Sequence, residues 1–219
     1  MKFLIKDKQI KFFKDNGFIE FSDFFLNDER NNLFEEIKQT ISKKLNTNIN
    51  NADSLDIYKN SRDLFRSSKF IKSFDLSRNL SQISYALSNL NSLQLAFDQS
   101  LIGNVKSFFK DSCSINDLFC FKGLEIIILI KLDDSDFEIK DDLLSIKPNN
   151  IIFLNPNKII NFKPYFDYFL NFFLIGYARS NNLMYIENKN DINLHLIKKM
   201  GYGFGDNLKN NNFPIIASS

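Results

Sequence analysis

Few side chains in this sequence could carry out acid–base or metal chemistry. His195 is the only histidine among 219 residues, and Cys113 and Cys120 are the only cysteines. A disulfide framework is therefore excluded. Cys120 lies in an apolar run, which predicts a reduced core residue and no role in chemistry. No Walker, G-x-S-x-G or C-x-x-C motif is present.

His195 lies on a predicted helix over residues 192–200, between Asp191 and Lys199 at four-residue spacings. The apolar residues of that segment lie on the opposite face; they are Ile192, Leu196 and Met200. We therefore expect the imidazole to face solvent. With no serine or cysteine partner in a matching context, it is a poor candidate for a general base.

Two segments have the composition of ligand loops but the wrong spacing. GYGFGD at residues 201–206 has the pattern G-x-G-x-G after a helix, whereas a dinucleotide fingerprint needs G-x-G-x-x-G between a strand and a helix. The run from Asp134 to Glu138 begins like a calcium loop, but Ile139 and Ser145 replace the required Gly and Glu. We predict a turn and a charged connection, and no metal site.

Asp98 and Gln99 follow an apolar strand and could point into a cleft. No second carboxylate lies near Asp98 in the sequence, so acid–base catalysis has no support there. No catalytic residue is predicted.

The composition is that of a globular protein of AT-rich coding bias, with 25 Phe and no Trp. Net charge is +2 with interspersed signs, and no basic stripe with aromatics suggests nucleic-acid binding. No signal peptide or membrane span is found. We therefore expect a cytoplasmic location and no membrane contact; export without a cleaved signal peptide is the alternative.

The elements follow from hydrophobic periodicity. Residues 124–132 are nearly all β-branched or Leu, which predicts a strand apolar on both faces in the middle of a sheet. Helices are predicted at residues 7–16 (ending at Gly17), 27–45 and from Ser77, and residues 46–60 are predicted to be a loop. Further strands are predicted at SLQLAFDQSLI, LLSI, IIFL, YFLNFFLIGYA and LMYIE.

This order of helices, many short strands and one last helix predicts an α+β fold with a mainly antiparallel sandwich or barrel. We expect a single domain over residues 1–219. Its parts are a mainly helical 1–92, a β-rich core at 93–190, and a C-terminal helix and tail at 191–219.

The opening FFKDNGFIEFSDFF, followed by a helix that starts with Asp and Glu, resembles the phytanoyl-CoA dioxygenase family of iron(II)- and 2-oxoglutarate-dependent oxygenases. KPNNIIFLNP resembles that family's P-G-D-x-x-x-F turn and strand, with Asn149 where Gly is usual. The resemblance implies a double-stranded β-helix (a jelly-roll, cupin-like core) with N-terminal helices and one C-terminal helix.

The activity of that family requires an H-x-D/E…H triad, which holds iron on one face. The resemblance would put the two histidines in the region of residues 93–118 and at residues 157–161, and neither contains one. We therefore expect no metal and no cofactor. Arg179, at the end of a late strand, is the one candidate cofactor-binding residue, because the family uses such an Arg for the 2-oxoglutarate carboxylate. The alternative is an ordinary solvent-facing arginine.

Three functions stay open from the sequence. The first is a non-catalytic protein of this fold that binds a small molecule or a protein partner. The second is an enzyme of the same fold with a different site, and the third is a surface-interaction or exported effector protein. A polar cavity near Arg179, Lys158 or Asp98 would favour a ligand-binding or enzymatic role, an interior packed with Phe and Ile would exclude an internal site, and a large apolar surface patch would favour the third.

Overall fold

The apolar run in the middle of the chain forms a central strand, as its composition predicts. In the computed structural model, which describes residues 5–108, 110–134, 147–168, 170–209 and 212–216, β5 (Leu124–Lys131) lies between β6 (Ile151–Leu154) and β8 (Phe172–Arg179). It is antiparallel to both. A strand covered on both faces has no solvated side, which is why nearly every position is apolar.

These strands belong to a six-stranded antiparallel sheet with the order β1-β6-β5-β8-β2-β10. The other members are β1 (Phe18–Phe21), β2 (Leu93–Leu101) and β10 (Ile215–Ile216). Two short antiparallel pairs accompany it, β3 (Ser112–Cys113) with β7 (Ile160–Asn161) and β4 (Phe121–Lys122) with β9 (Met184–Tyr185). The described strands form open sheets and no closed barrel.

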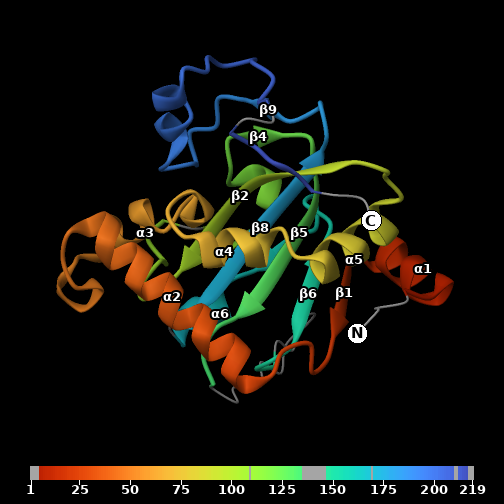
Figure 1. The fold of residues 1–219 in the computed structure, drawn as a ribbon, viewed down its shortest axis with the longest axis horizontal. Helices are drawn as coiled ribbons and strands as arrows, with labels where there is room; N and C mark the ends of the chain where they lie inside the picture. The colour runs from red at the N-terminus through yellow and green to blue at the C-terminus, as the bar shows by residue number, and fades with distance from the viewer. Residues whose placement is uncertain (1–4, 109, 135–146, 169, 210–211, 217–219) are drawn as a thin grey trace.

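Helices cover one face of the large sheet (Figure 1). They are α1 (Asp7–Asn16), α2 (Asn27–Leu45), α3 (Ser54–Asn60), α4 (Lys69–Asp75) and α5 (Arg78–Ser88). Their apolar residues form one core with alternate residues of the strands, for example Ile37 and Leu80 with Ile128. No described helix is long and apolar enough to cross a membrane.

The opposite face of the sheet carries the two short strand pairs, α6 (Lys163–Asp167) and the C-terminal segment. Short 3-10 turns complete the chain; they are Ile49–Asn51, Leu64–Arg66, Ile115–Asp117, Leu194–Leu196 and Lys198–Met200. Aromatic rings and aliphatic side chains share the core on this second face, where seven of the 25 phenylalanines are buried.

Most of the predicted elements are confirmed, including the left-handed close of α1 at Gly17 (φ 75°). Asn149 also has a positive φ, 67°, at the turn where the resembling family has Gly. The predicted strand LLSI lies outside the described residues.

Two predictions about local structure are wrong. The predicted loop at residues 46–60 is wrong for its second half, because Asp53 accepts hydrogen bonds from Leu55 N and Asp56 N and so starts α3; residues 46–53 are irregular apart from the 3-10 turn at Ile49–Asn51. Residues 192–200 form two 3-10 turns and no α-helix. As a result Asn193 and Ile197 are buried while Ile192 is exposed.

Candidate functional site

The two regions where the resemblance would put metal-binding histidines lie side by side. Ser112 in β3 is paired with Asn161 in β7, and Cys113 with Ile160. These four side chains offer a hydroxyl, an amide, a thiol and an alkyl group. The topology therefore brings parts of the two regions together, and the residues paired there are poor iron(II) ligands.

The donor set does not fit a two-histidine, one-carboxylate iron site. Burial raises the pKa of the Cys113 thiol to about 11, with Asp117 adding to the effect, so the thiolate is disfavoured. Within the described part of the chain, no three His, Cys, Asp or Glu side chains are grouped so that they could hold a metal ion.

Aromatic rings fill part of the sheet face opposite the helices. The Phe97 ring stacks on Phe119 with centroids 4.4 Å apart and on Phe121 at 5.3 Å. All three rings are buried. The close approach depends on Gly176 in β8, because a Cβ there would lie 2.3 Å from the Phe97 ring. This packing matches the sequence-based criterion for an interior without a site.

One ion pair lies within this aromatic environment. Arg62 and Asp191 are both buried, with Nη2 of the arginine 3.3 Å from Oδ1 of the aspartate. The guanidinium lies over the Phe119 ring at 4.4 Å and donates from Nε to the Gln99 side chain at 2.7 Å. Burial opposes the charge on Arg62, but Asp191 and its other neighbours outweigh it and raise the arginine pKa.

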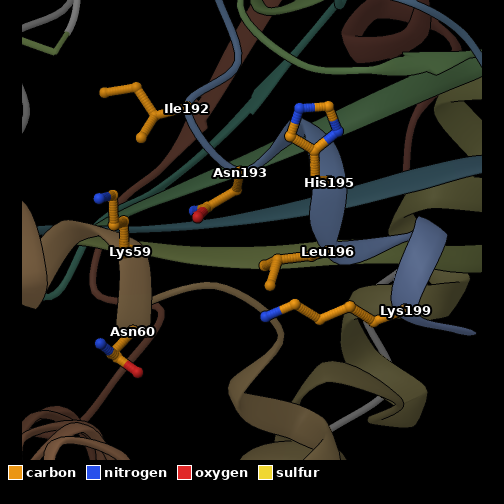
Figure 2. Close-up of a pocket in the computed structure, with 7 residues that line it drawn as sticks. All are labelled: Lys59, Asn60, Ile192, Asn193, His195, Leu196 and Lys199. Carbon is orange, nitrogen blue, oxygen red and sulfur yellow. The ribbon is translucent and has the colours of Figure 1, made fainter.

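The ion pair joins two chain segments that border a cavity of about 310 Å³ (Figure 2). One wall is the end of α3, with Lys59 and Asn60, which comes just before Arg62 in the chain. The other wall follows Asp191 and comprises Ile192, Asn193, His195, Leu196 and Lys199. This volume is at the lower end of the range for small-molecule sites.

The Asn193 side chain lines the cavity although the residue is only 4% exposed. Its Nδ2 has no hydrogen-bond partner among the described residues. The carboxylate of Asp191 is already used, because it accepts from the backbone nitrogens of Asn193 and Cys120, each at 2.9 Å, besides Arg62. An unpaired buried amide costs free energy unless a further group accepts from it.

A separate group of buried carboxylates lies on the helix-covered side of β2. Asp98 accepts from Leu64 N at 2.6 Å and Phe65 N at 2.7 Å, and burial followed by the charge of Asp63 raises its pKa to about 6. Burial, followed by the charge of Asp98, raises the pKa of Asp75 well above its ordinary value. Neither Asp75 oxygen has a hydrogen-bond partner among the described residues. Burial and the neighbouring Asp98 therefore favour the neutral, protonated form of Asp75.

The structure places the sequence-predicted candidates apart from one another. Arg179 lies at the exposed end of β8 in an ion pair with Glu125 at 3.2 Å. Lys158 is half-buried, with Nζ 5.7 Å from the centre of the Phe18 ring. Asp98 points toward the helices, where the fold brings it close to Asp63 and Asp75, carboxylates that are distant from it in the sequence. His195 is exposed, as predicted, at the cavity.

Of the two ligand-like loops, the structure describes only the one at residues 201–206, which is the predicted turn. Residues 201–206 form an exposed turn in which Gly203 N donates to Asp206, and the buried Phe213 ring packs against Tyr202. Most of the acidic loop, at residues 135–146, lies outside the described residues.

Sequence analysis missed the cavity and the ion pair that borders it. Arg62 lies 129 residues from Asp191 in the chain, and nothing in the local pattern links them. The one local signal is Asp191 itself, whose carboxylate accepts a hydrogen bond from Asn193 N two residues later.

Solved structures with this fold include non-heme iron enzymes. SnoK, an alpha-ketoglutarate-dependent carbocyclase of nogalamycin biosynthesis, matches with a TM-score of 0.69 and 12% identity over 97% of each chain. The epimerase SnoN matches at 0.67 and 10% identity over 96% of this chain and 98% of its own. CytC3, solved with Fe(II) and alpha-ketoglutarate, matches at 0.61 and 11% identity over 95% and 87%. This chain has their fold.

No protein-family model matches the sequence, and no curated protein is similar to it. At 10–12% identity the likeness to the solved structures concerns the fold, and function must be argued from the residues of this chain.

Proposed function

We propose that this protein is a metal-independent binding protein, built on the jelly-roll fold of iron- and alpha-ketoglutarate-dependent enzymes, that does not oxygenate its ligand. The pairing of Ser112 with Asn161 carries the proposal, because these residues occupy the regions where the resemblance would put the two histidines. Serine and asparagine side chains cannot replace imidazoles as ligands of a redox-active iron.

The filled interior supports the same proposal. The stacked rings of Phe97, Phe119 and Phe121 fill part of the sheet face opposite the helices, which leaves less room there for a cosubstrate. Arg179, the residue that the resemblance suggests for a cosubstrate carboxylate, is paired with Glu125 at the surface.

The test is thermal unfolding of the purified protein under anaerobic conditions, with and without manganese(II) plus alpha-ketoglutarate, alongside elemental analysis. A ligand at about 100 times its dissociation constant stabilises a protein by about 2.7 kcal/mol, or several degrees in the unfolding midpoint. CytC3, which has been solved with Fe(II) and alpha-ketoglutarate, is the positive control.

We expect no bound transition metal and no midpoint shift with this protein, while CytC3 is stabilised. A shift that needs both the metal and alpha-ketoglutarate would overturn the proposal and assign the chain a cosubstrate site. Manganese alone and alpha-ketoglutarate alone are measured in parallel, so that simple binding of either one is recognised.

A further inference from the structure

The Arg62–Asp191 ion pair fixes the relative position of the two walls of the cavity, which are the end of α3 and residues 192–199. Residues 59 and 60 are separated from Arg62 only by Ser61, and residues 192 and 193 follow Asp191 directly. Two buried charges that neutralise each other fix the spacing between these walls without leaving a free charge behind the cavity.

The side chains that line the cavity carry positive charge and no acid. Lys59 lies on one wall and Lys199 on the other, and none of the seven lining residues is Asp or Glu. Neither lysine forms an ion pair within 4.0 Å with another residue in the described part of the chain. In Figure 2 the two ammonium groups lie on either side of the Asn193 amide.

Asn193 provides a second, independent indication of a ligand. Its amide is nine-tenths or more buried, its Nδ2 lacks a partner among the described residues, and it points into the space between the walls (Figure 2). A buried neutral donor between two ammonium groups matches an oxyanion, which has several acceptor lone pairs to share.

We propose that this cavity binds a small organic anion through its carboxylate or phosphate group. The oxygens of that group accept hydrogen bonds from Asn193 Nδ2, Lys59 Nζ and Lys199 Nζ, and the carbon part contacts Ile192 and Leu196. The inference rests on the proposed function, to which it gives a site and a ligand class. The site is separate from the β3–β7 pair, so no metal takes part.

Isothermal titration calorimetry without metal tests the inference with two probes, glutarate and inorganic phosphate, at constant ionic strength. Glutaramide, which has the shape of glutarate without its charge, is the control ligand. We expect saturable binding of one or both anions with one site per chain, and none of glutaramide. Binding of only one anion identifies the carboxylate or the phosphate as the group recognised.

Three variants localise the site. Lys59→Gln, Lys199→Gln and Asn193→Ser each remove one donor, and loss of a hydrogen bond to a charged group weakens binding by about tenfold or more. Lys198→Gln is the matched control, because it makes the same charge change next to Lys199, while Lys198 Nζ lies over the Phe204 ring at 4.3 Å and outside the cavity lining. We expect the control to stay within about twofold of the wild type, as a screened charge effect would.

The inference is overturned if neither anion binds, or if Lys59→Gln and Lys199→Gln bind as tightly as Lys198→Gln does. The two proposals can fail separately. If manganese plus alpha-ketoglutarate stabilises the Lys59→Gln/Lys199→Gln double variant as it does the wild type, the protein is not metal-independent. The anion titrations would then still decide whether this cavity binds an anion. Absence of anion binding with no metal effect would refute this site alone.

Discussion

The Arg62 guanidinium and the Asp191 carboxylate form a buried ion pair that connects the end of α3 to the C-terminal segment across 129 residues of sequence. Gln99 in β2 holds the arginine from the sheet side, and Cys120 N holds the aspartate. The pair thus ties three parts of the chain together at the border of the cavity.

Removing one partner of this pair should destabilise the protein strongly. We expect Asp191→Ala to lower the free energy of unfolding by about 3–5 kcal/mol, because it leaves the Arg62 charge buried and uncompensated. Urea unfolding at neutral pH measures the change. In the Arg62→Met/Asp191→Ala double variant the loss should be smaller than the sum of the two single losses; strict additivity would mean that the two groups do not interact.

The Asp75–Asp98 pair predicts that part of the stability depends on pH. Both pKa values are raised in the folded state, so the native protein binds these protons more tightly than the unfolded chain does. Stability from these groups is therefore full below the unfolded-state pKa of about 3.9 and declines as pH rises through about 6, where Asp98 loses its proton.

Asp75→Asn should remove much of this dependence. The asparagine amide is neutral, as the protonated acid is, but it cannot ionise, so we expect about 1–3 kcal/mol more stability than the wild type at pH 8 and little difference near pH 4. Urea unfolding of the variant and the wild type between pH 4 and pH 8 measures this difference in stability. The contrasting variant is Asp98→Asn, whose amide cannot accept fully from Leu64 N and Phe65 N. A loss of stability with Asp75→Asn at pH 8 would refute the assignment of the proton to Asp75.

The pattern of apolar residues within a segment was enough to predict several helices and strands. The apolar run of β5 and the three- and four-residue stripe of α2 specify a buried strand and an amphipathic helix without knowledge of the rest of the chain. The mixed helix-and-sheet class follows from the order of these elements. The likeness to iron- and alpha-ketoglutarate-dependent enzymes came from the opening FFKDNGFIEFSDFF and from KPNNIIFLNP, and the fold of SnoK and SnoN agrees with it.

Features that depend on long-range contacts were not predictable in the same way. Asp98 meets Asp75 only because α4 packs over β2, and the short helix α4 has no pattern strong enough to be recognised. The pattern of the segment after Asp191 predicts an amphipathic helix. In the structure Asp191 instead forms an ion pair with Arg62 and accepts a hydrogen bond from Asn193 N, and Asn193 is buried. The cavity also could not be predicted from local patterns, because its two walls are joined by the long-range Arg62–Asp191 ion pair.

Both cysteines should be unreactive in the folded protein. Burial raises the pKa of the Cys113 thiol to about 11 and also raises the pKa of the Cys120 thiol. Few thiolates therefore exist at pH 8. We expect a chromogenic disulfide reagent to react slowly with the native protein and with two thiols per chain in urea. Fast reaction of either thiol without denaturant would show that the aromatic layer opens readily.

The contact between Gly176 and Phe97 gives the most direct test of the filled interior. A Cβ at Gly176 would lie 2.3 Å from the Phe97 ring, so the ring would have to move against Phe119 and Phe121. We expect Gly176→Ala to cost about 1–3 kcal/mol of unfolding free energy, the usual effect of overpacking, as measured by urea unfolding. Phe97→Leu provides space at the same position, and the double variant should therefore be more stable than the sum of the two single losses predicts. If Gly176→Ala is as stable as the wild type, the ring has room to move, and this part of the sheet face is open to a ligand after all.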